Sequence, residues 1–143
     1  MSTKAAKEIL ALLDRAGSFN ENDTNLQEAI GYLISSVSHT RSFTIATTDS
    51  LTPNVDQVDL VNITALTSAL VVNNPIGTPK DGDGFVLKIK DNGSPRAISW
   101  GGNYRAFGQA LPLTTVTSKA MYIPMIYSAA DNKWDVLPYN EEV

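Results

Sequence analysis

The residues best suited to chemistry lie in the segment DGDGFVLKIKDN, at positions 81–92. Four of its side chains carry the hard oxygen atoms that Ca²⁺ prefers, namely those of Asp81, Asp83, Asp91 and Asn92. An EF-hand loop beginning at the first of them would need an acid or amide at its fifth position, glycine at its sixth and glutamate at its twelfth. Those positions hold Phe85, Val86 and Asn92, so the EF-hand pattern fails. A calcium site built from separate loops stays open as the alternative.

The same segment, extended to residue 100, also has the pattern of a β-hairpin. Apolar residues alternate with other positions before and after its centre, at Phe85, Leu87, Ile89, Ile98 and Trp100. The Asp-Asn-Gly sequence at 91–93 tolerates the positive φ angles that tight hairpin turns require. We therefore predict a hairpin whose turn is formed by residues 91–93.

The sequence does not contain the complete set of residues for other common kinds of catalytic site. The chain has no cysteine, which excludes thiol nucleophiles and cysteine-based metal sites. Its single histidine, His39, is interpreted as a capping or interface residue, although a threefold axis would bring three copies together. There is no P-loop, GxSxG or GxGxxG motif. Two carboxylates suffice for glycosidase chemistry, but Asp56 and Asp59 fit ordinary polar positions of a strand and turn. We predict a protein without catalytic residues, cofactor or metal.

Four aromatic residues are candidates for binding rather than catalysis. A flat outer face that exposed Trp100, Tyr104, Phe107 and Trp134 would suit a sugar ligand. The alternative is that these side chains belong to the core or to a subunit interface, as most aromatic residues of a β-sandwich do.

Composition narrows the classes of partner. The formal net charge of −4 and the pI near 4.8 argue against a nucleic-acid binder, which would carry a basic stripe. No apolar run approaches the roughly 18–20 residues that span a bilayer. The N-terminal segment has acids within its apolar stretch and no small-residue cleavage site, so we expect no signal peptide and synthesis in a cytoplasm.

The first forty residues have helical periodicity. A first helix is predicted over about 3–16, with Gly17 ending it. A second begins at a capping box formed by Thr24 and Gln27. We predict that their apolar stripes form an anchor and oligomer interface made of Ile9, Leu10, Leu13, Leu26, Ile30, Leu33, Ile34 and Val37. Helices this short are marginal alone in water, so these stripes need a partner surface.

Residues 41–143 change character and become rich in β-formers separated by turn residues. About seven short strands at this spacing favour a mainly β domain, an antiparallel β-sandwich or jelly-roll-like fold. The predicted organisation is therefore an N-terminal helical segment, residues 1–40, followed by a β-sandwich domain, residues 41–143. No internal repeat of solenoid length is visible.

Three segments carry a resemblance to a known family. They are VNNPIGTPKDGDGFVLKIKDNGSPRAISW at 72–100, YRAFGQALPLTT at 104–115 and MYIPMIYSAADNKWDV at 121–136. In order and spacing they resemble a domain of bacteriophage and prophage virion proteins, which is often found at the C-terminus of longer chains. The likeness covers about residues 41–138, and Pro124 departs from it, since a small residue is more usual there. The resemblance implies a surface module of a virion, commonly trimeric, on heads or tail fibres, and it carries over no catalytic residue.

The length of the predicted helices bears on where in a virion such a protein would be located. Each predicted helix spans only about 20 Å at 1.5 Å per residue, which is short for a fibre shaft. A compact anchor fits a trimeric capsid decoration protein (a cement or head-fibre protein) attached to the major capsid lattice and made in the cytoplasm of a bacterial host. The alternative is a short tail-fibre or tail-tip protein that binds a receptor, such as a host-surface glycan. A polysaccharide depolymerase fragment fits less well, because such enzymes generally use long β-helices.

Overall fold

The computed structural model describes residues 41–143. The chain divides into two units at this point, Met1–Thr40 and Arg41–Val143, and the following account concerns the second. The predicted helices, His39 and the interface residues Ile9, Leu10, Leu13, Leu26, Ile30, Leu33, Ile34 and Val37 lie outside the described residues.

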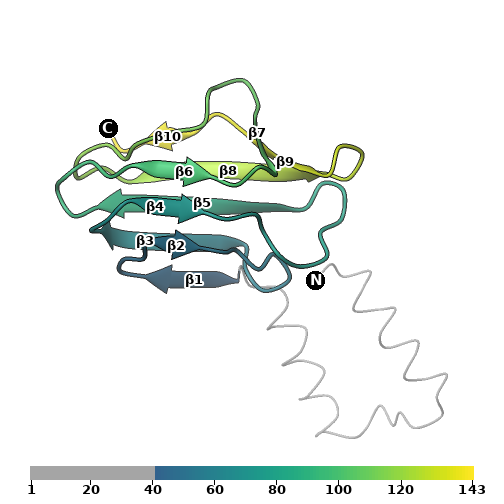
Figure 1. The fold of residues 1–143 in the computed structure, drawn as a ribbon, viewed down its shortest axis with the longest axis horizontal. Helices are drawn as coiled ribbons and strands as arrows, with labels where there is room; N and C mark the ends of the chain where they lie inside the picture. Colours follow the sequence, from purple (N-terminus) through teal and green to yellow (C-terminus); the bar gives the residue numbers. More distant parts are fainter. Residues whose placement is uncertain (1–40) are drawn as a thin grey trace, which may run out of the picture. The chain divides into compact units, whose positions relative to one another are not determined.

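The described unit is built from strands, so the prediction of a mainly β domain is confirmed. The larger sheet contains β1 (Ser42–Ile45), β3 (Leu60–Leu66), β5 (Gly84–Asp91), β8 (Met121–Ser128), β9 (Lys133–Val136) and β7 (Tyr104–Ala106) in that spatial order, with β10 (Asn140–Glu141) also paired to β8. The smaller sheet contains β2 (Ser50–Leu51), β4 (Leu70–Val72) and β6 (Ile98–Trp100). Figure 1 shows the smaller sheet lying over β3, β5 and β8 of the larger one.

From β1 to β6 the chain alternates between the two sheets. Strands β1, β3 and β5 are parallel neighbours in the larger sheet, and β2, β4 and β6 are parallel neighbours in the smaller one. Two consecutive strands, one in each sheet, therefore form one coil of the chain. Successive coils stack on one another through the parallel pairing of their strands. Antiparallel pairing enters with β8, which lies beside β5, β9 and β10. The expectation of an antiparallel domain is wrong for the stacked coils, because an in–out alternation of side chains looks the same in both kinds of pairing.

The predicted hairpin is also wrong. Strand β5 pairs with β3 and β8, whereas β6 pairs with β4 in the other sheet. The chain still turns at Gly93, whose φ of 102° is open to glycine. At this turn the chain leaves the larger sheet and enters the smaller one. The apolar residues before and after the turn therefore pack into the same core from opposite sheets.

The stacked coils leave no repeat in the sequence because they differ in length. One coil runs from Ser42 to its neighbour Leu60, and the next runs from Leu60 to Val86 with a long connection between β4 and β5. An insertion of this size erases a fixed period while leaving the strand pairing intact.

One core lies between the sheets. The smaller sheet contributes Leu70, Val72 and Ile98, and the larger contributes Ile63, Leu87, Ile123 and Val136, all buried. Each strand places alternate residues inward, as the burial of β5 shows. The opposite side of the larger sheet faces away from this core and is called the outer face below. Its side chains are those of the residues that alternate with the buried ones along each strand.

Candidate functional site

The acids and the amide of residues 81–92 are engaged in separate hydrogen bonds. The Asp81 carboxylate accepts from the Ala129 amide at 2.9 Å, and that of Asp83 accepts from the Lys80 amide at 2.7 Å. Asn92 Oδ1 accepts from the Arg96 guanidinium at 2.9 Å. Within residues 41–143 no group of three or more acids or histidines is placed to hold a metal ion. These side chains of the segment 81–92 are thus used in separate contacts within the described unit.

Asp91 is the buried member of this set, with only 4 % of its surface exposed. Its carboxylate accepts hydrogen bonds from the Thr115 hydroxyl at 2.7 Å, the Ser118 amide at 2.8 Å and the Gly93 amide at 2.9 Å. Burial alone would raise the pKa of Asp91, but these donors and the nearby Arg96 charge lower it below the usual value. The side chain thus fixes the crossing from β5 to β6 as a charged group.

The four predicted ligand-contact aromatics do not form one exposed platform. Trp134 and Tyr104 are 3 % and 6 % exposed and belong to the core, so the prediction of outer-face contacts is wrong for both. Trp100 is partly buried against the core and its indole N–H donates to the Pro112 carbonyl at 2.8 Å. Phe107 is 56 % exposed and is the one of the four that is largely open to solvent. Alternation along β9 places Trp134 inward, between the outward positions of Lys133 and Asp135.

The core aromatics pack edge to face. Phe85 and Trp134 have ring centroids 5.1 Å apart, as do Trp100 and Tyr104, with interplanar angles of 71° and 72°. The buried Tyr104 hydroxyl donates to the Asn73 carbonyl at 2.9 Å, and burial raises the pKa of this phenol. These four aromatic residues of the family-like segments therefore serve packing.

A hollow on the outer face was not predicted. Its floor is a row of four residues in register across four strands: Asn62 on β3, Lys88 on β5, Tyr122 on β8 and Asn140 on β10. The hollow has a volume of about 460 Å³. Its remaining lining residues are Thr64, Lys90, Ala120, Glu141 and Glu142. The row combines residues from four separate parts of the chain, and only the strand order brings them together.

Tyr122 is the aromatic residue of this hollow, and its side chain is 47 % exposed. The Lys88 ammonium lies 5.1 Å from the ring centroid in a cation–π contact. The neighbours of Tyr122 in β8, Met121 and Ile123, are both buried, so the tyrosine necessarily points outward. The alternation of residues along this strand could be predicted from the sequence. Which strands lie on either side of β8 could not.

The C-terminal segment forms one side of the hollow through Glu142. Its carboxylate accepts from the Ala120 amide at 3.1 Å and from the Lys90 ammonium at 3.3 Å. The Ala120 amide is the larger cause, and Lys90 the second, of a pKa below the ordinary glutamate value. Glu142 therefore stays ionised at neutral pH and balances Lys90.

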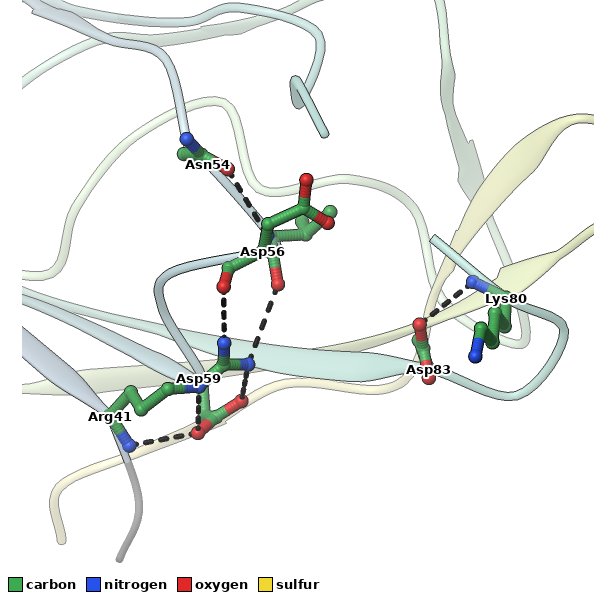
Figure 2. Close-up of polar contacts among 7 residues, drawn as sticks. Arg41, Asn54, Asp56, Asp59, Lys80 and Asp83 are labelled. Carbon is green, nitrogen blue, oxygen red and sulfur yellow. Dashed lines mark hydrogen bonds and ion pairs between the residues drawn. The ribbon is translucent and has the colours of Figure 1, made fainter. Parts of the chain in front are cut away.

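A second polar cluster lies at the start of the described unit (Figure 2). Arg41 holds both carboxylate oxygens of Asp59, with Nη2–Oδ1 at 2.7 Å and Nε–Oδ2 at 3.1 Å, and its backbone amide donates to Oδ2 at 2.8 Å. Its other guanidinium nitrogen donates to the Asp56 carbonyl. The side-chain hydrogen bond from Arg41 is the largest cause of the lowered pKa of Asp59.

The acids around Arg41 hold loops in place. Asp56 Oδ1 accepts from the amide and hydroxyl of Thr78, at 2.9 and 3.1 Å, which ties the 55–58 turn to the connection before β5. Figure 2 also shows the local bond between Asp83 and the Lys80 amide. The prediction that Asp56 and Asp59 are structural positions therefore agrees with their contacts.

No family model, curated protein or solved structure matches this chain. Among residues 41–143 there is no helix with the length and apolar character needed to cross a membrane.

Proposed function

We propose that this chain is a non-enzymatic structural protein of a tailed bacteriophage, a homotrimer on the virion surface that decorates the capsid. The run of motifs over residues 72–136 carries the proposal, because in order and spacing it resembles a phage virion domain. In this proposal the β unit projects from the particle, and the N-terminal stripes join the three copies and attach them to the capsid lattice.

The geometry of the motif residues supports a structural role. Asp91, Gly93, Trp100, Tyr104 and Trp134 all lie within the family-like segments, and each one fixes a turn or packs the core. The carboxylates of Asp56, Asp59 and Asp91 accept hydrogen bonds from Thr78, from Arg41 and from Thr115 with Ser118, respectively. A stable module with these internal contacts suits a protein whose task is to persist on a particle.

Light scattering of the purified full chain tests the assembly. We expect a mass three times the 15.4 kDa of the single chain. Leu33→Asp should reduce this mass to that of a monomer, since it places a charge in the predicted apolar stripe. Ser35→Asp, on the opposite side of the same predicted helix, is the matched control and should leave the trimer intact. A monomeric wild-type chain at micromolar concentration would count against the trimer.

A tail-tip or short tail-fibre protein that binds a receptor is the second candidate. The hollow around Tyr122 favours it, because an exposed aromatic ring among polar side chains is a common feature of ligand sites. Labelling of intact particles with an antibody against the chain separates the two placements, since signal over the head supports decoration and signal at the tail supports the alternative.

A further inference from the structure

The hollow around Tyr122 has the size and construction of a small-ligand site. Its volume of about 460 Å³ lies within the range of roughly 300–1,000 Å³ that is typical of such sites. The floor row formed by Asn62, Lys88, Tyr122 and Asn140 sits on four hydrogen-bonded strands, so its positions are fixed by the sheet. A site on strands holds its side chains more precisely than one on loops.

The floor presents an aromatic surface flanked by amides. Tyr122 is 47 % exposed although Lys88 covers part of the ring, so a ligand can reach the remaining surface. Asn62 and Asn140 lie one strand away from Lys88 and Tyr122 respectively. A pyranose ring has C–H groups on its faces and hydroxyls around its rim. An aromatic ring with amides and an ammonium beside it offers the matching partners.

Asn62 provides an independent sign of a missing partner. Its Oδ1 is buried and has no hydrogen-bond partner in the described unit. A buried amide oxygen without a partner is costly and uncommon in folded proteins. Asn62 also lines the hollow, so its amide is a lining group with unused hydrogen-bonding capacity beside the space that a ligand would occupy.

The charges around the hollow indicate which sugars fit. Two lysines, Lys88 and Lys90, are matched by two glutamates, Glu141 and Glu142, so the lining has no net charge. Lys90 is already paired with Glu142 at 3.3 Å. An anionic or cationic sugar would find no excess of opposite charge here, whereas the hydroxyls of a neutral sugar can hydrogen-bond to the amides and to Lys88 without one.

We infer that the outer-face hollow binds a neutral pyranose sugar that stacks on Tyr122 and donates or accepts hydrogen bonds at Asn62, Lys88 and Asn140. This inference concerns one surface of the chain and stands whether the protein sits on a head or a tail. It places sugar binding at residues other than the aromatics that the sequence suggested.

Titration of the isotopically labelled full chain with methyl glycosides, followed by backbone amide NMR, tests the inference. The neutral probes are the methyl glycosides of glucose, galactose and N-acetylglucosamine, and glucuronic acid is the charged probe. We expect at least one neutral probe to give saturable shifts at residues 62, 88, 122 and 140–142 with millimolar affinity. Glucuronic acid should bind at least about tenfold more weakly.

Variants separate stacking from general effects of mutation. Tyr122→Ala should weaken binding of the neutral probe about tenfold or more, whereas Tyr122→Phe keeps the ring and should retain most of it. Phe107→Ala removes an exposed aromatic outside the hollow and should leave the affinity unchanged. The amide spectrum of each variant shows whether the fold is kept.

Three results would overturn the inference. They are the absence of saturable shifts with every neutral probe, an affinity for glucuronic acid equal to or above that for the neutral probes, and unchanged binding in folded Tyr122→Ala. None of them bears on whether the chain forms trimers or belongs to a virion, because the titration uses the isolated protein.

Discussion

The carboxylate of Asp91 accepts three hydrogen bonds in a nearly buried position at the end of β5. In the sequence it looked like a ligand for a metal ion, because its neighbours are also acids and amides. Its environment could not be predicted, since two of its donors, Thr115 and Ser118, come from a distant loop. The same applies to the aromatics: alternation indicates which side of a strand Trp134 and Tyr122 occupy, but not which side the second sheet covers.

Asp91→Asn should destabilise the protein by about 1–3 kcal/mol, because the new amide group cannot accept from all three donors. Urea unfolding at neutral pH measures the change in the free energy of unfolding. Asp49→Asn, at an exposed position, is the matched control and should change it little. Equal stability of the Asp91 variant and the wild type would show that the carboxylate does not hold the crossing.

The lowered pKa of Asp91 also predicts a pH dependence. A group whose pKa is lower in the folded state stabilises the fold above its unfolded pKa, near 3.9 for aspartate, and loses this contribution as pH falls through the folded value. The stability advantage of the wild type over Asp91→Asn should therefore be full at neutral pH and shrink below about pH 4. If the stability advantage of the wild type over Asp91→Asn increased as the pH fell, the assignment of a charged Asp91 carboxylate in the folded state would be contradicted.

At the scale of elements, the positions of β-rich segments could be predicted from the sequence, but their partners could not. The segment 84–100 was correctly expected to contain two strands and a turn at Gly93, yet these strands belong to different sheets. Both a hairpin and a crossing between sheets need a residue that accepts positive φ. What distinguishes them is the buried side chain of Asp91, which anchors the turn to a third segment.

Gly93→Ala tests this crossing. Its φ of 102° is strained for an L-residue, while the space for a Cβ is adequate, with Ser118 Oγ at 3.7 Å. We expect a loss of about 1–2 kcal/mol in the free energy of unfolding. Gly102→Ala is the matched control, since a Cβ there meets nothing within 4 Å and its φ is not in the positive range. Equal effects of the two substitutions, measured by thermal unfolding, would show that the conformation of Gly93 is not special.

At the scale of the whole molecule, the described unit joins a stack of parallel coils to antiparallel strands that extend the same large sheet. This arrangement gives the described unit a large sheet with one face on the core and an outer face that carries the hollow around Tyr122. The stack could not be predicted, because its coils differ in length and leave no repeat. The proposed role on a virion depends on the sequence resemblance and on the predicted N-terminal stripes, and the β unit adds a stable surface to them.

A density map of intact phage particles that encode this chain is the most direct measurement of that role. The proposal predicts three copies of the β unit grouped around a threefold axis and projecting from the capsid lattice, with residues 1–40 at the attachment. Particles that are complete but lack this chain altogether would contradict the central claim that it is a structural protein of the virion.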